Sequence, residues 1–191
     1  MGLYDIPAMI KFIQKKTETK LKKKKITYIG HSQGTTQFFA GMTLIPDFYE
    51  ENFNGMIALG PISNSEFLES PFIKLMVNLH LDYIEDKLGL TEIFPNMKFI
   101  INFDKFLCEN IPYLCKKTLE LFSDKDTEEI DMSRFLVFVG HYPSGTSYRC
   151  LKHFTQNYKN KIFATYGDMI PYDFTKPKNI KIALMVGGKD E

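Results

Sequence analysis

The sequence predicts an α/β protein organised around a short parallel sheet. Three apolar runs, at residues 26–29, 55–61 and 180–186, have the length and composition typical of buried strands. A helical pattern follows the first run and ends near Pro46, because proline cannot continue a helix. Since parallel sheets normally contain more than three strands, we expect the chain to form the middle part of a larger α/β fold.

The spacing of these runs along the 191 residues predicts three regions. Residues 1–61 are expected to form a core segment, and residues 175–191 return to the core as its last strand. Between them, residues 62–174 show mostly helical patterns interrupted by prolines. An insert of this size between sheet strands is typical of a cap or lid over a functional site.

A helix is expected before the first strand, because Asp5 can cap it and Pro7 suits its first turn. Apolar residues then recur at helical spacing, with lysines on the opposite face, which predicts one face directed toward the core. These apolar residues are Ile6, Met9, Ile10 and Ile13. The polar stretch 17–25, which ends in a run of lysines, is interpreted as a solvated loop that leads into the first strand.

The most informative motif lies where the first apolar run meets the following helix. Gly30-His31-Ser32-Gln33-Gly34 spells G-x-S-x-G between a predicted strand and a predicted helix, which is the context of a nucleophile elbow. In such an elbow the serine hydroxyl stands clear of the sheet, and the glycines let strand and helix approach closely. The next amide, that of Gln33, then points toward the position of an oxyanion. Without this context, the same pattern could arise by chance in a surface turn.

Composition and charge exclude several other classes of function. With 44% hydrophobic residues, 25% charged residues and a net charge of +1, the chain has no electrostatic affinity for nucleic acid or anionic membranes. No apolar stretch has the length of a transmembrane span, and the first residues do not form a signal peptide. The 17 Phe and 10 Tyr residues suit a large core and a pocket for apolar ligands equally well.

The three cysteines allow two interpretations. Cys108 and Cys115 enclose a short loop and could pair in an oxidising compartment, which would leave Cys150 over. In a reducing compartment all three would be small buried apolar residues. Their spacing alone favours neither interpretation.

Several blocks of sequence, taken in order, resemble the acid lipases, the family of the gastric and lysosomal lipases. These blocks are Asp5–Ile10, Tyr28–Thr36, Ala58–Ile62, His141–Ser147, His153–Gln156 and Val186–Asp190. The ordered series covers essentially the whole chain and is more specific than any one motif. The resemblance implies a partial α/β-hydrolase fold, in which parallel strands and a nucleophile elbow carry a large, mostly helical cap or lid insert.

The resemblance also implies a mechanism and assigns residues to it. Ser32 would be the nucleophile, the Gln33 N–H one oxyanion donor, and Asp190 the carboxylate that orients a catalytic histidine. The reaction would be hydrolysis of neutral lipid esters, acylglycerols or sterol esters, through an acyl-enzyme and with transient contact at a lipid–water interface. It requires no metal or organic cofactor, and family members are secreted or lysosomal. Cys108 and Cys115 fall where the family has a disulfide in its cap.

Parts of the family pattern are missing from these 191 residues. The catalytic histidine of the family follows the acidic residue by roughly 30 positions, which places it beyond Glu191. The first sheet strands, and the loop that supplies the second oxyanion donor, would precede Met1. We therefore expect a chain truncated at both ends, without the signal peptide of its relatives and with little or no activity of its own.

None of the four histidines in the chain is expected to replace the missing base. His31 adjoins Ser32, but its side chain should point away from the serine into the packing of the sheet or helix. His80, His141 and His153 are interpreted as structural or solvent-facing. A non-catalytic lipid-binding or interaction protein on a lipase scaffold is therefore the main alternative, and a thioesterase with the same triad is a further one.

Overall fold

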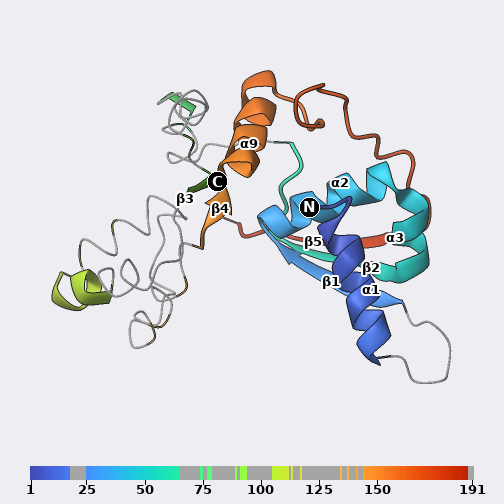
Figure 1. Ribbon diagram of the computed structural model, residues 1–191, viewed down its shortest axis with the longest axis horizontal. Coiled ribbons are helices and arrows are strands. Elements are labelled where there is room, and N and C mark those ends of the chain that lie inside the picture. The colour runs from blue at the N-terminus through green and yellow to red at the C-terminus, as the bar shows by residue number, and fades with distance from the viewer. Residues whose placement is uncertain are drawn as a thin grey trace. The chain divides into compact units, whose positions relative to one another are not determined.

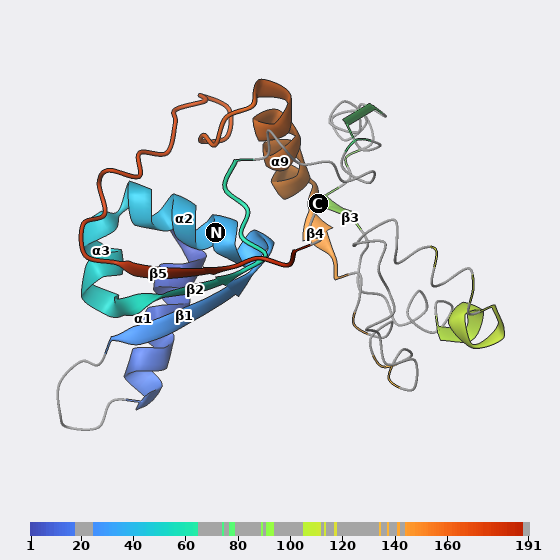
Figure 2. The same cartoon turned by 180° about the vertical axis from the view of Figure 1, so that it is seen from behind.

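In a computed structural model the chain forms two compact units (Figures 1 and 2). The first unit contains Met1–Ser65 and Ile162–Asp190, and the second contains Glu66–Lys161 together with Glu191. The residues that the structure describes are 1–17, 25–64, 74, 77–78, 89, 91–93, 105–111, 113, 117, 134, 137, 141 and 144–188. Most of the predicted lysine-rich loop lies outside the described residues.

The first unit is built on a parallel sheet, as the sequence predicts. Strands β1 (Ile26–His31), β2 (Phe53–Leu59) and β5 (Lys181–Met185) lie side by side in the order β1-β2-β5. Helices α2 (Gln33–Leu44) and α3 (Pro46–Asn52) connect β1 to β2 (Figure 1). Both pairings in the sheet are parallel, and the strands end together. This arrangement confirms the predicted α/β fold class.

One face of this sheet carries the core. Buried side chains of the helices and of β2 form a single cluster with a residue from the segment before β5. The members of this cluster are Ile6, Ile10, Phe38, Phe39, Met42, Tyr49, Phe53, Met56, Ala58 and Phe163. Burial alternates along β1, and Ile29 on the opposite face is 65% exposed. The helices therefore cover one side of β1 and leave its other side open to solvent.

Four aromatic rings form the centre of the core. The ring centroid of Phe38 in α2 lies 4.8 Å from Tyr28, 4.9 Å from Tyr49 and 5.0 Å from Phe53. Tilted and edge-to-face contacts of this kind are the favoured arrangements of aromatic pairs. The ring of Tyr49 reaches this position because residue 41 is glycine, since a Cβ at Gly41 would overlap the Tyr49 ring.

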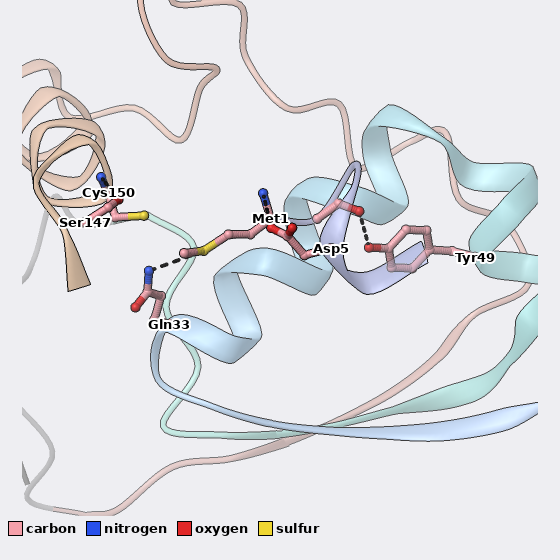
Figure 3. Close-up of polar contacts among 7 residues, drawn as sticks. Met1, Asp5, Gln33, Tyr49, Ser147 and Cys150 are labelled. Atoms are coloured by element: carbon pink, nitrogen blue, oxygen red, sulfur yellow. Dashed lines mark hydrogen bonds and ion pairs between the residues drawn. The ribbon is translucent and has the colours of Figure 1, made fainter. Parts of the chain in front are cut away.

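A buried hydrogen bond holds the N-terminal segment against this core. The hydroxyl of Tyr49 donates to the carbonyl of Gly2 over 2.7 Å (Figure 3). Burial, with a smaller contribution from Tyr28, raises the pKa of Tyr49 far above its ordinary range. The hydroxyl therefore keeps its proton and remains a donor across the physiological range of pH.

Helix α1 (Asp5–Thr17) lies where the sequence predicts it, but its buried face is narrower than predicted. Ile6 and Ile10 are buried, whereas Met9 is 61% exposed and Ile13 is 41% exposed. Ile6 and Ile10 are one helical turn apart and form a single row along the helix. Only this row joins the core cluster, so the neighbouring apolar residues remain in solvent.

The second unit contains a short antiparallel pair, β3 (Glu92–Ile93) with β4 (Thr146–Ser147), and helix α9 (Tyr148–Asn160). Ser147 caps this helix, because its hydroxyl accepts a hydrogen bond from the Cys150 N–H over 3.2 Å (Figure 3). The helix therefore begins at the end of the strand pair, with no intervening loop.

Residues 162–180 belong to the first unit and contain no helix, although the predicted helical region extends to residue 174. The backbone forms turns here because Gly167 has a φ of 89° and Pro171 interrupts any helical run. The carbonyl of Phe163 accepts from the Tyr172 N–H over 3.0 Å, and the rings of these two residues lie 4.5 Å apart. This stretch therefore differs from the helical pattern expected for it.

A carboxylate of α3 fixes the segment that leads into β5. Oε1 of Glu50 accepts hydrogen bonds from the backbone N–H of Lys178 over 2.6 Å and of Asn179 over 3.3 Å. These bonds lower the pKa of the Glu50 carboxyl below its ordinary value, and the bond from the Lys178 N–H has the largest effect. The contact connects two parts of the first unit that are distant in sequence.

We expect this contact to make the stability of the first unit depend on pH in acid. A carboxyl whose pKa is lowered in the folded state stabilises the fold above its unfolded pKa, about 4.3 for glutamate, and this contribution is lost as the pH falls through the folded pKa. In urea unfolding, the difference between the wild type and Glu50→Gln should be constant near neutral pH and shrink below about pH 4. Glu51→Gln is the matched control, and a Glu50→Gln difference that persists in acid would contradict the prediction.

Candidate active site

The serine of the G-x-S-x-G motif lies in a tight turn between β1 and α2, as the sequence predicts. The strand ends at His31, the helix begins at Gln33, and Ser32 between them has φ 50° and ψ −117°. A residue other than glycine rarely adopts such a conformation, which costs about 1–3 kcal/mol and persists only where the surroundings enforce it. The Ser32 side chain makes no capping hydrogen bond to α2, so helix capping does not account for the serine.

Gly30 allows the strand to run close to the start of the helix. A Cβ at this position would lie 2.8 Å from Cε1 of Tyr28 and 3.0 Å from the carbonyl carbon of Gly34. At Gly34, by contrast, a Cβ would make only an ordinary contact, 3.6 Å from the Tyr28 hydroxyl. A side chain is therefore excluded at Gly30, where the strand runs against the backbone of Gly34, whereas the space beside Gly34 would admit a Cβ.

Tyr28 of β1 forms a hydrogen bond across the turn that contains Ser32. Its hydroxyl donates to the carbonyl of Gly34 over 2.9 Å, and its ring packs against Phe38. Burial raises the pKa of Tyr28, so the hydroxyl remains protonated and able to donate. The bond joins β1 to the first turn of α2 across the residue that lies in the strained conformation.

The three strands of the sheet end in one row, and Ser32 follows at that edge. His31, Leu59 and Met185 are paired across the sheet. One residue further along, the Ser32 N–H donates to the Leu59 carbonyl over 3.0 Å, and the Gly60 N–H donates to the Met185 carbonyl over 2.9 Å. The carboxyl ends of parallel strands are where open α/β sheets bind their ligands, so Ser32 lies at the chemically relevant edge.

Asp190, the predicted acid, comes shortly after β5 and lies outside the described residues. Strand β5 runs parallel to β1, with β2 between them. The end of β5 therefore lies at the same edge of the sheet as Ser32. This direction is the one that an acid following β5 requires in order to act with a serine following β1, and the role of Asp190 stays a prediction.

The amide that follows Ser32 is placed to receive negative charge. Gln33 is the first residue of α2, and the first N–H groups of a helix have no acceptor within the helix. Together with the positive end of the helix dipole, they favour an anion beside Ser32. The Gln33 side chain turns toward the N-terminal segment, where its Nε2 donates to Sδ of Met1 over 3.6 Å (Figure 3). The backbone, and not the amide side chain, is thus the group suited to an oxyanion.

The histidines differ in their surroundings. His31 is exposed at the end of β1, because it lies on the open face of the strand, so the expectation that it packs into the sheet or helix is wrong. His141 is exposed, and its carbonyl accepts from the Ser144 hydroxyl over 2.9 Å. His153 is half-buried in α9, and His80 lies outside the described residues.

Thr35 is a member of this site that sequence reasoning missed. It is fully buried in the first turn of α2, and its hydroxyl donates to the carbonyl of Ser32 over 2.6 Å. A signal existed, because two threonines in succession, Thr35 and Thr36, follow Gly34 directly, and threonine is a poor choice for a helix unless its hydroxyl has a partner.

The structure describes two of the three cysteines. Cys108 is buried and disulfide-bonded, whereas Cys115, its predicted partner, lies outside the described residues. Cys150 carries a thiol.

Within the described ranges, no three potential metal ligands of the His, Cys, Asp and Glu types come together. Among the helices that the structure describes, none is long and apolar enough to cross a membrane.

Comparisons with known proteins identify lipases as relatives. The chain is 33% identical to gastric triacylglycerol lipase of Mus musculus, in an alignment that covers 100% of the chain and 50% of that protein. It is 32% identical to lysosomal acid lipase/cholesteryl ester hydrolase of Homo sapiens, over 87% of the chain and 41% of that protein. It is 31% identical to Lipase 1 of Drosophila melanogaster, over 95% of the chain and 38% of that protein. No family model matches the chain. The chain thus spans about half the length, or less, of these curated relatives.

Proposed function

The chain belongs to the acid lipases, a family of carboxylic-ester hydrolases, and from that premise we propose that Ser32 is the nucleophile of an esterase that acts on neutral lipids. The observation that carries this proposal is the strained backbone of Ser32 at the carboxyl end of β1, directly before the first amide of α2. A serine held in this way serves catalysis better than it serves folding. The names of the relatives, triacylglycerol lipase and cholesteryl ester hydrolase, favour acylglycerols or sterol esters as substrates.

In the proposed mechanism, Oγ of Ser32 attacks the carbonyl carbon of the ester and its proton passes to a histidine oriented by Asp190. The carbonyl oxygen becomes an oxyanion, which the Gln33 N–H stabilises. The C–O bond to the alcohol breaks, the alcohol leaves with the proton from the histidine, and the acyl group remains on Ser32. Water then attacks the acyl carbon and gives a proton to the histidine. The bond between this carbon and Oγ breaks, Oγ takes the proton back from the histidine, and the fatty acid leaves.

We propose further that these 191 residues by themselves turn over little substrate. The family pattern places the triad histidine after the acid, and His31, the histidine next to Ser32 in sequence, is exposed on the open face of β1. Without its base, a serine hydrolase retains only binding and oxyanion stabilisation, a loss on the order of 10⁴-fold or more. In its working form the protein would be secreted or lysosomal and would meet substrate transiently at a lipid–water interface.

A base added from solution provides the test. We expect free imidazole to increase the hydrolysis of p-nitrophenyl butyrate by the 191-residue chain, because imidazole can take the place of the missing histidine. The chain is kept in a non-ionic detergent, since Ile29 of β1 and Ile182 and Leu184 of β5 are exposed. The rate is measured above the reaction of imidazole with ester alone, and it should saturate with imidazole concentration.

Two controls interpret this rate. His31→Ala should keep the imidazole-dependent rate, because His31 is not the base. Replacement of imidazole by a base of similar pKa that is too bulky to approach Ser32 should remove it, because a general base must reach the proton that it accepts. A chain that binds the ester but shows no imidazole-dependent turnover would instead support the non-catalytic lipid-binding alternative. A preference for thioesters over acyl esters would support the thioesterase alternative.

A further inference from the structure

The backbone carbonyl of Ser32 is linked, through the Thr35 hydroxyl, to the segment that follows β2. After β2 the chain turns at Gly60, whose φ is 51°, and passes through Pro61 to Ile62. Ile62 is close to Ser65, where the first unit ends in this part of the chain. Ile62 itself is joined by hydrogen bonds to the first turn of α2, which follows Ser32 directly.

The hydroxyl of Thr35 makes two of these contacts at once. It donates to the Ser32 carbonyl over 2.6 Å and accepts from the Ile62 N–H over 2.9 Å. A hydroxyl has one proton to donate, so the acceptor lone pair is the only group that can receive the Ile62 amide. The direction of both bonds is thereby fixed. The Thr35 side chain is fully buried, so water does not compete for either partner.

Thr36 binds the other backbone polar group of Ile62, its carbonyl. Its hydroxyl donates to the Ile62 carbonyl over 2.8 Å. The N–H and the carbonyl of Ile62 are thus both bound by hydroxyls from the first turn of α2. Thr36 differs from Thr35 in one respect that matters for a test, because its hydroxyl has no bond to Ser32 among those that the structure gives.

We propose that Thr35 is a positioning residue, which holds the strained peptide of Ser32 and couples it to Ile62, in the segment that follows β2. The proposal rests on the proposed function, in which Ser32 is the nucleophile. The Ser32 carbonyl accepts from both the Thr35 N–H, over 2.9 Å, and the Thr35 hydroxyl. Loss of the hydroxyl removes one of these two donors and also leaves the Ile62 amide without its acceptor. The orientation of Ser32 then depends on fewer constraints.

Hydrogen exchange measures whether this tie exists. Thr35→Val keeps the shape of the side chain but removes the hydroxyl, and it should speed exchange on the order of 10-fold in peptides that cover Tyr28–Ala40 and Leu59–Asn64. Thr36→Val is the matched control and should speed exchange in the second peptide alone. Thr35→Ser retains the hydroxyl and should leave both peptides near the wild type. Faster exchange in the second peptide alone, or in neither, for Thr35→Val would overturn the proposal.

A graded series protects the test against a variant that does not fold. Thr35→Cys has a thiol that hydrogen-bonds only weakly, so its effect should lie between those of the serine and valine variants. The second readout is the rate at which a fluorophosphonate labels Ser32 in the presence of imidazole. This rate should fall on the order of 10-fold in Thr35→Val and recover in Thr35→Ser, while Thr36→Val labels at the wild-type rate.

The two readouts separate the two claims. A wild type that is not labelled would overturn the proposed function, and with it the role of Thr35 in positioning a nucleophile. A wild type that is labelled, with Thr35→Val labelled equally fast, would overturn the inference about Thr35 alone. Slower labelling in Thr35→Val with recovery in Thr35→Ser supports it, because a loss of packing without a lost hydrogen bond would not be rescued by serine.

Discussion

Replacing Ser32 by alanine is expected to remove all imidazole-dependent hydrolysis by the chain. The nucleophile of a complete triad is worth on the order of 10⁶-fold in turnover, so the small rate expected here should fall to the background of imidazole and ester alone. The comparison is made at equal concentrations of folded protein, checked by circular dichroism. Hydrolysis that continues unchanged in Ser32→Ala would show that another group carries the reaction.

The same position provides a thermodynamic control. Ser32→Gly also lacks the hydroxyl, but glycine adopts positive φ without the strain that serine carries at φ 50°. Ser32→Gly should therefore be inactive and more stable than Ser32→Ala by about 1 kcal/mol in urea unfolding. An alanine variant as stable as the glycine variant would indicate that the turn stores no strain.

Replacing Phe38 by alanine is expected to have the largest effect on stability. Phe38 is fully buried and lies within 5.0 Å of three other rings, those of Tyr28, Tyr49 and Phe53. Truncation of a buried phenylalanine costs about 3–5 kcal/mol, from lost burial and from the cavity that remains. Because a domain of this size is stable by only about 5–15 kcal/mol, the first unit should lose a large part of its stability.

Phe12 is the matched control for this prediction. It lies on α1 and is 61% exposed, so Phe12→Ala should change the free energy of unfolding by about 0.5 kcal/mol or less. Both variants are measured by urea unfolding followed by tyrosine fluorescence, since the chain contains no tryptophan. Equal effects of the two substitutions would contradict the description of the core.

The features that the sequence predicted well are those determined by local pattern. The strands, the helix after Ser32 and the turn between them follow from short apolar runs and from the spacing of the motif. The ordered motifs resemble those of the acid lipases, and the lipase relatives agree with that resemblance. Gly30 was assigned correctly, because close approach of strand and helix is a requirement of the motif itself.

The features that the sequence predicted poorly depend on tertiary contacts. Met9 and Ile13 match the helical pattern as well as Ile6 does, and only packing decides which of them is buried. His31 was expected to be packed, but the face of β1 on which it lies is open. The two successive threonines indicate that the Thr35 hydroxyl has a partner, but its partner Ile62 is distant in sequence, so local pattern does not identify it.

The assignment of Ser32 as the nucleophile is tested most directly by locating the covalent adduct of a fluorophosphonate on the chain. The protein is treated in the presence of imidazole, digested with protease, and analysed by tandem mass spectrometry. We expect a single phosphonyl group on Ser32, and none after Ser32→Ala or after prior unfolding in urea. Absence of an adduct from the folded chain, or an adduct on any other residue, would contradict the assignment of Ser32 as the nucleophile.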